Sequence, residues 1–111
     1  MTSDVSFIEI GSGDAGKARA FFGQLFGWDF HPLGNGQEGW FQAPSIIIGM
    51  HGNDPDPGVF AFFNVPDLEV AIAKVKELGG EAGDPVDEPG FGRFSFCKDP
   101  QGMRFGLHLL N

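Results

Sequence analysis

Three ionisable side chains stand within apolar, strand-like segments of this chain: Glu9, His51 and His108. A carboxylate on an apolar face is costly to bury without a partner, so Glu9 must reach solvent or meet a cation or hydrogen-bond donor. Two kinds of chemistry would use these residues. In one, Glu9 is a general base and His108 polarises a substrate; in the other, all three ligate zinc or iron, which imidazole and carboxylate suit. The structural alternative is that the histidines are polar groups at strand ends, half exposed or hydrogen-bonded to backbone.

The elements that must position these residues occur in two copies. The motif that begins at Phe7 recurs 53 positions later at Phe60. The strand 7–10 is followed by Asp14, Ala18, Phe22, Leu25 and Gly27, and the strand 60–63 by Asp67, Ala71, Val75, Leu78 and Gly80. Two copies are too few for a solenoid. The repeat predicts a single domain over 1–111, with two like halves about a pseudo-two-fold axis and a shared cleft in which function lies.

The first module, about residues 5–51, is predicted as one strand, one helix and three more strands. Alternating residues predict a strand over 5–10, and Asp14 and Gly27 are good start and end residues for a helix. Three short antiparallel strands follow, up to His51. A connector at 52–58 carries two prolines and polar turn formers.

The second module, about residues 59–110, repeats this order and makes the fold class α+β. A strand over 59–65 precedes a helix capped by Asp67, whose buried stripe is expected to run from Leu68 to Leu78. Prolines and a glycine make 81–92 the weakest strand, an edge or a mobile flap. The segments 93–98 and 103–109 are predicted to pair as a hairpin.

Charge and composition exclude several classes of function. Fifteen acidic against seven basic residues give a formal charge of -8, which repels nucleic acid and anionic membranes and favours a cationic partner. No apolar run approaches the roughly 20 residues that span a bilayer, and the N-terminus does not resemble a signal peptide. We therefore expect a cytoplasmic protein. Cys97 is the only cysteine and is expected to be a buried structural residue.

Several short motifs, taken in order, resemble one known superfamily. They are Phe21-Phe22 before Leu25-Phe26-Gly27-Trp28, then Leu78-Gly79-Gly80, then Asp99-Pro100-Gln101-Gly102 before the last strand. The chain is identified as resembling the vicinal oxygen chelate superfamily, which includes glyoxalase I, bleomycin resistance proteins, extradiol dioxygenases and fosfomycin resistance enzymes. The resemblance implies cup-shaped modules, a homodimer, and a divalent metal held in the cleft by His, Gln or Glu from the first and last strands of each module.

Residue by residue, however, the metal ligands of that superfamily are missing. Phe7 and Phe60 stand where its metal enzymes usually have His or Gln, and Gly49 and Gly106 where they usually have Glu. Neither residue type ligates a divalent metal. No cofactor is therefore predicted. The alternative, a shifted metal site of Glu9, His51 and His108, requires a step of about 6.6 Å along each strand.

The same positions suggest a pocket for a small molecule. The two glycines are expected to leave room in the cup, with Glu9 and His108 as its few polar groups and Phe91 as a flap. The predicted ligand-binding residues are Phe7, Glu9, Trp40, Ile48, Gly49, His51, Phe60, Phe62, Phe91, Gly106 and His108. The alternative for every phenylalanine among them is ordinary core packing.

These observations predict a metal-independent protein that binds a small hydrophobic or cationic molecule between the modules, as bleomycin resistance proteins sequester a drug. The alternative is an enzyme of the lyase, isomerase or dioxygenase type, with a non-standard metal site or with Glu9 as base. A third hypothesis is a structural or regulatory module whose cup is filled by its own side chains.

Overall fold

The computed structural model describes residues 2–34 and 36–109. Their contacts divide the chain into two compact units. The N-half unit is Phe7–Phe60, and the C-half unit combines Met1–Ser6 with Ala61–Asn111. The shared cleft stays a prediction of the sequence.

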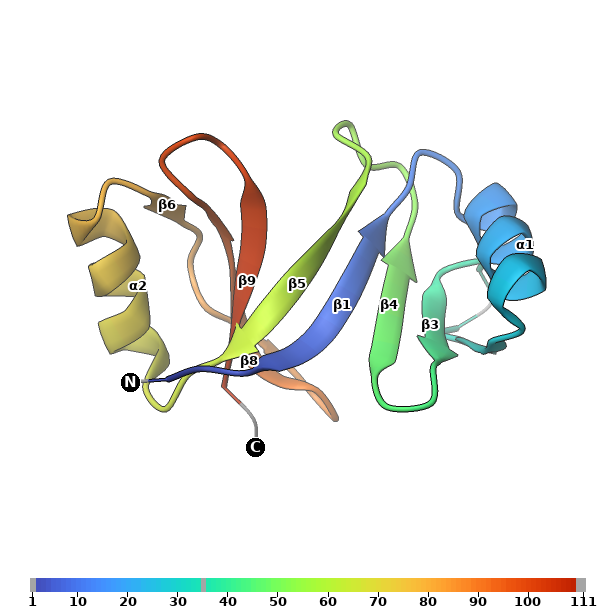
Figure 1. Ribbon diagram of the computed structural model, residues 1–111, viewed down its shortest axis with the longest axis horizontal. Coiled ribbons are helices and arrows are strands. Elements are labelled where there is room, and N and C mark those ends of the chain that lie inside the picture. Colours follow the sequence, from blue (N-terminus) through green and yellow to red (C-terminus); the bar gives the residue numbers. More distant parts are fainter. Residues whose placement is uncertain (1, 35, 110–111) are drawn as a thin grey trace. The chain divides into compact units, whose positions relative to one another are not determined.

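The N-half unit has the predicted order of strand, helix and three strands. Its elements are β1 (Val5–Gly11, from residue 7 onward), α1 (Ala15–Phe26), β2 (Asp29–Pro32), β3 (Gly39–Gln42) and β4 (Ile47–His51). β1 runs parallel to β4, and β3 runs antiparallel to β4 (Figure 1). β2 is antiparallel to β3. The register places Glu9 beside Gly49, and Gly49 beside Trp40.

Helix α1 covers one face of these strands. Asp14 caps it by accepting a hydrogen bond from the backbone of Lys17, and Gly27 ends it in the left-handed conformation at φ 69°, as predicted. Ala18 packs with Ile10, Phe41, Ile48 and Met50 in the core between helix and sheet. Because side chains alternate along a strand, Phe7, Glu9, Gly49 and His51 lie on the opposite face.

The C-half unit contains β5 (Gly58–Asn64, from residue 61), α2 (Leu68–Glu77), β6 (Glu81–Ala82), β7 (Val86–Glu88), β8 (Gly92–Lys98) and β9 (Arg104–Leu109). β5 is parallel to β9, and β8 and β9 form the predicted hairpin. The weak strand expected over 81–92 is two short strands, β6 and β7, which both pair with β8. The N-terminal residues join this unit, since Asp4 accepts a hydrogen bond from the backbone of Asn64.

Helix α2 buries Leu68, Ala71 and Ile72 against β8 and β9. Leu78, predicted to end the buried stripe, is instead 65% exposed. The reason is that Leu78 is the C-cap residue, after which Gly79 turns the chain away at φ 92°. Cys97 is buried, and burial raises the pKa of its thiol, which makes it an unreactive core residue.

The prediction of an α+β fold with two copies of a strand and a helix followed by further strands is confirmed, except that, as far as residue 109, four strands and not three follow the helix in the second copy. Neither helix in the described part of the chain has the length and apolar character needed to cross a membrane.

Candidate functional site

Glu9, His51 and Asp54 form an ionic array in the N-half unit. His51 Nδ1 lies 2.5 Å from Glu9 Oε2, and His51 Nε2 lies 2.8 Å from Asp54 Oδ2. The parallel register of β1 and β4 brings Glu9 near the end of β4. The chain beyond β4 is tied back by hydrogen bonds from Ser12 N to His51 O and from Asp54 N to Ser12 O. These backbone bonds hold Asp54 on the second ring nitrogen.

This arrangement favours the cationic form of His51. Each ring nitrogen faces a carboxylate, and ionised carboxylates only accept hydrogen bonds, so the doubly protonated ring satisfies both contacts. Burial alone would lower the pKa of His51, but the hydrogen bonds and charges of Glu9 and Asp54 raise it above its ordinary value. One imidazolium between two carboxylates leaves the array with one net negative charge. The His51 side chain is 33% exposed, so the array meets solvent.

Asp54 was not among the residues selected from the sequence. It lies in the connector at 52–58, where its place between Asn53 and Pro55 indicates only a turn. Its contact with His51 depends on the backbone hydrogen bonds to Ser12, which join residues far apart in the chain. Asp54 is only three residues from His51, but this spacing in a turn does not by itself indicate the contact.

The room expected above Gly49 does not exist. A Cβ on Gly49 would collide with Glu9 Oε1 and would lie 2.6 Å from Phe7 Cζ. The glycine is therefore needed because its two neighbours on β1 pack directly over its backbone. The side chains of Phe7 and Glu9 therefore occupy the space above Gly49, next to His51 and Asp54.

Ile48 was wrongly predicted to line the same site as Gly49. It is buried in the core beneath α1, because adjacent residues of a strand point to opposite faces. Trp40, in contrast, is the cross-strand neighbour of Gly49 and shares its face. Its indole stacks on the ring of His31 at 4.1 Å between centroids. Trp40, Phe7 and the array therefore occupy one face of the N-half sheet.

His108 belongs to the C-half unit and is 2% exposed. Its Nε2 donates to the Phe91 carbonyl at 2.8 Å, and its Nδ1 lies 3.0 Å from Ser6 Oγ. The imidazole also stacks on the Phe91 ring at 3.9 Å. Both nitrogens are thus used to hold the Phe91 segment and the N-terminal strand in place. This geometry fits a structural role and gives no access for polarising a substrate.

An aromatic cluster fills the C-half face on which His108 lies. Phe62, Phe91, Phe94 and Phe96 meet edge to face, with centroids 5.2–6.1 Å apart. Phe62 is 2% exposed and covers Gly106, whose Cβ would lie 2.5 Å from the ring or closer. The room expected above Gly106 is therefore also occupied. Phe91, predicted as a flap, is packed within this cluster, and Phe60, in the N-half unit, is buried.

The residues present do not fit the metal that the superfamily resemblance implies. Phe7, Phe60, Gly49 and Gly106 offer no ligand atoms in their side chains. Both ring nitrogens of His51 and of His108 are engaged by protein groups. Within residues 2–34 and 36–109, no three His, Cys, Asp or Glu side chains are grouped to hold a metal ion.

Comparisons with known proteins identify the family. The family model of the glyoxalase-like domain matches residues 7–108. No curated protein sequence matches the chain significantly. A hypothetical protein from Bacillus halodurans C-125 has a similar structure, with a TM-score of 0.73, 12% identity, and coverage of 100% of this chain and 96% of that one.

Two further solved structures are similar. A glyoxalase/bleomycin resistance protein/dioxygenase superfamily member from Vibrio splendidus 12B01 has a TM-score of 0.71 and 15% identity, covering 99% of this chain and 100% of that one. Methylmalonyl-CoA epimerase from Mycobacterium tuberculosis has a TM-score of 0.67 and 14% identity, and the match covers 96% of this chain and 87% of that one. Identities this low show the fold alone. The family model establishes that the chain belongs to the glyoxalase-like domain family, and the shared fold agrees with the resemblance to the vicinal oxygen chelate superfamily.

Proposed function

We propose that this protein is a metal-independent member of its family that binds a small hydrophobic molecule, with cationic molecules favoured. The observation that carries the proposal is the array of Glu9, His51 and Asp54, whose two carboxylates outweigh one imidazolium. The array lies on the same face as Phe7 and Trp40. Aromatic rings beside a net negative charge suit an organic cation.

The N-half unit is the better candidate for the binding face because the two units differ on the face away from their helices. In the C-half unit the aromatic cluster packs onto itself over Gly106, and His108 is buried. In the N-half unit His51 and Trp40 remain partly exposed. Although Phe96 of the C-half cluster is 50% exposed, the burial of His108 favours a self-filled cup on that face, and the exposed part of His51 favours binding on the N-half face.

Glu9 is a poor general base in this arrangement. A hydrogen bond from an imidazolium stabilises the charged form of a carboxylate and so weakens its pull on a substrate proton. The enzymatic alternative therefore has less support than binding.

Two measurements test the proposal together. The first is the metal content of protein incubated with zinc, iron, manganese, nickel and cobalt, measured by plasma mass spectrometry; we expect far less than one metal per chain. The second is calorimetric binding of benzylamine, with benzyl alcohol as the neutral match. We expect benzylamine to bind more tightly, and Glu9→Gln to weaken it about tenfold, or about 1.4 kcal/mol.

Glu81→Gln is the matched control, since Glu81 is an exposed carboxylate on β6 in the other unit. It should leave benzylamine binding unchanged. Near-stoichiometric metal that is lost in Glu9→Gln would overturn the proposal and favour the enzymatic alternative. Equal effects of the two variants would mean that only the overall charge attracts the amine.

We also propose that two copies of the chain associate. The superfamily commonly pairs chains, and α1 leaves Phe21, Leu25 and Phe26 more than half exposed. Clustered apolar side chains of this kind are usually covered by a partner. Light scattering should give about twice the chain mass of 11.9 kDa. A mass of one chain at micromolar concentration would contradict the dimer.

A further inference from the structure

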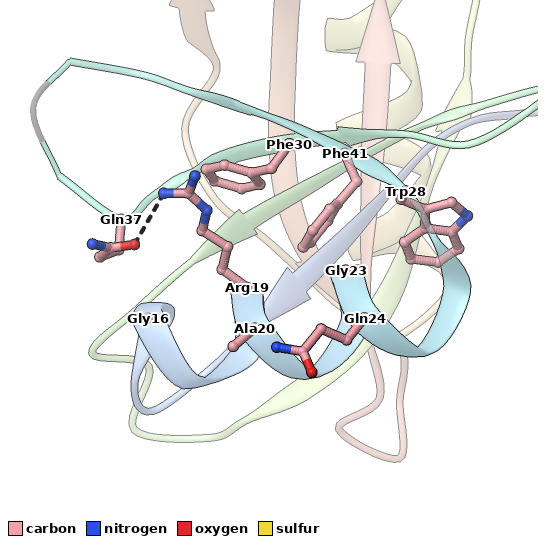
Figure 2. A pocket seen from close by; sticks show the side chains of 9 residues that line it. All are labelled: Gly16, Arg19, Ala20, Gly23, Gln24, Trp28, Phe30, Gln37 and Phe41. Carbon is pink, nitrogen blue, oxygen red and sulfur yellow. Dashed lines mark hydrogen bonds between the residues drawn. The ribbon is translucent and has the colours of Figure 1, made fainter.

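A cavity of about 380 Å³ opens between α1 and the strands β2 and β3 of the N-half unit (Figure 2). It lies on the side of the sheet that α1 covers, whereas Glu9 and His51 lie on the other side. Helix α1 leaves this space open because its lining residues Gly16, Ala20 and Gly23, one helical turn apart, have small side chains or none. The cavity is thus separate from the binding face proposed above.

Three aromatic side chains line the cavity: Trp28, Phe30 and Phe41. Phe41 is completely buried and lies 5.0 Å from Phe30 and 5.6 Å from Trp28 between ring centroids. Phe41 supports Trp28 and Phe30, and these two partly exposed rings make a preformed apolar surface, which a flat ligand covers at little entropic cost. The volume lies within the usual range for small-molecule pockets, about 300–1,000 Å³.

The polar groups of the cavity can hold an anion. The Arg19 guanidinium lies 4.4 Å from the centre of the Phe30 ring and donates from Nη1 to Gln37 Oε1 at 3.1 Å. Figure 2 shows this pair at one end of the cavity, with Trp28 toward the other. Gln24 adds a second carboxamide, and no Asp or Glu is among the nine lining residues.

We propose that this cavity binds a planar aromatic carboxylate. The ring would lie against Trp28, which Phe41 supports from beneath, and the carboxylate would take the forked N–H groups of Arg19, a pairing that guanidinium geometry favours. The Phe30 ring holds Arg19 by stacking, and Gln37 orients it, so the cation is already in place. In a chain of formal charge -8, this cavity has a cation and no carboxylate among its lining residues, although Asp14 lies beside Gly16 at its edge.

The test uses 2-naphthoate as the probe, with 2-naphthamide as its neutral match, and isothermal calorimetry as the readout. We expect saturable binding of the naphthoate that is at least tenfold tighter than binding of the amide. Arg19→Gln should weaken the naphthoate at least tenfold, and Ala20→Leu, which fills the cavity from α1, should abolish binding. The affinity of Arg19→Lys for 2-naphthoate should lie between those of the wild type and Arg19→Gln, because lysine keeps the charge but lacks the forked N–H groups.

Lys17→Gln is the matched control, since Lys17 is an exposed cation on the same helix that does not line the cavity. It should keep the wild-type affinity, as should Glu9→Gln on the opposite face of the sheet. Circular dichroism checks that each variant is folded. Binding that is absent, that does not distinguish naphthoate from naphthamide, or that survives in Arg19→Gln and Ala20→Leu would overturn the proposal.

Discussion

At the scale of single residues, His51 owes its properties to two carboxylates that the fold brings to it. In the unfolded chain its pKa is near 6.5, and in the folded chain Glu9 and Asp54 raise it. A raised folded-state pKa means that the native protein holds the proton more tightly than the unfolded protein. The resulting stability is fully present below about pH 6.5 and is lost as the pH rises through the folded-state pKa.

Replacing His51 by Gln should therefore destabilise the protein in a pH-dependent way. Near pH 5.5, we expect the free energy of unfolding of the wild type to exceed that of His51→Gln by about 0.5–1 kcal/mol, the range of a partly exposed ion pair. The difference should shrink toward zero near pH 9. Urea unfolding at several pH values measures it, with His31→Gln as the control for an exposed histidine that has no such array. A difference that grows with pH would mean that His51 is neutral when folded.

His108 should behave as a structural residue rather than a catalytic one. Removing its ring in His108→Ala removes the hydrogen bonds to the Phe91 carbonyl and to Ser6 and opens a cavity under Phe91. We expect a loss of about 2–4 kcal/mol in the free energy of unfolding. His31→Ala, at an exposed site, should cost less than about 1 kcal/mol. If His108→Ala is as stable as wild type, the structural role is wrong.

At the scale of elements, two glycines in similar sequence contexts have opposite requirements. Gly23 lies within α1, and a Cβ there would be 3.7 Å from Phe41, an ordinary contact. Gly106 lies in β9 directly beneath the Phe62 ring, where a Cβ does not fit. The same substitution should thus have opposite signs in the helix and in the strand.

We expect Gly23→Ala to stabilise the protein by about 0.5–1 kcal/mol, because alanine restricts the unfolded chain and favours helix. Gly106→Ala should destabilise it by about 1–3 kcal/mol, because Phe62 must move within a packed cluster. Thermal unfolding of both variants measures these effects. Two changes of the same sign would show that the ring above Gly106 can yield.

Local signals accounted for most of the elements. Asp14 and Asp67 cap the two helices as predicted, and the turn at Asp99–Gly102 joins β8 and β9. These features depend on neighbours within a few residues, so the sequence alone reveals them. The candidate site was less predictable. The His51 pairing with Glu9, and the filling of the space above Gly49 and Gly106, are contacts between residues far apart in the chain, which only folding brings together.

At the scale of the whole molecule, the duplication explains why the fold was easier to predict than the function. Each half must form the same elements, so their signals appear twice and support each other. The chemistry is not duplicated: Glu9 faces His51 in one half, while the matching region of the other half holds a cluster of phenylalanines. Binding therefore has to be argued for each half from its own side chains.

The excess of acidic residues should make stability depend on salt. Fifteen acidic and seven basic residues leave a formal charge of -8, so carboxylates repel one another in the native state. Exposed pairs such as Lys74–Glu77 and Arg93–Glu69 act in the opposite direction, but solvent screens each of them. Going from 10 to 150 mM sodium chloride shortens the screening length from about 30 to about 8 Å.

Because the long-range repulsion outweighs a few exposed attractive pairs, we expect added salt to raise the melting temperature by about 3 °C, a gain of about 0.5–1 kcal/mol. Thermal unfolding in sodium chloride measures this, and choline chloride at equal ionic strength separates general screening from the binding of sodium ions. Added salt should change the melting temperature least near pH 4.5, the isoelectric point, where the net charge is zero. A melting temperature that falls with salt near pH 7 would mean that attractive ion pairs, the His51 array foremost among them, dominate the electrostatics of the fold.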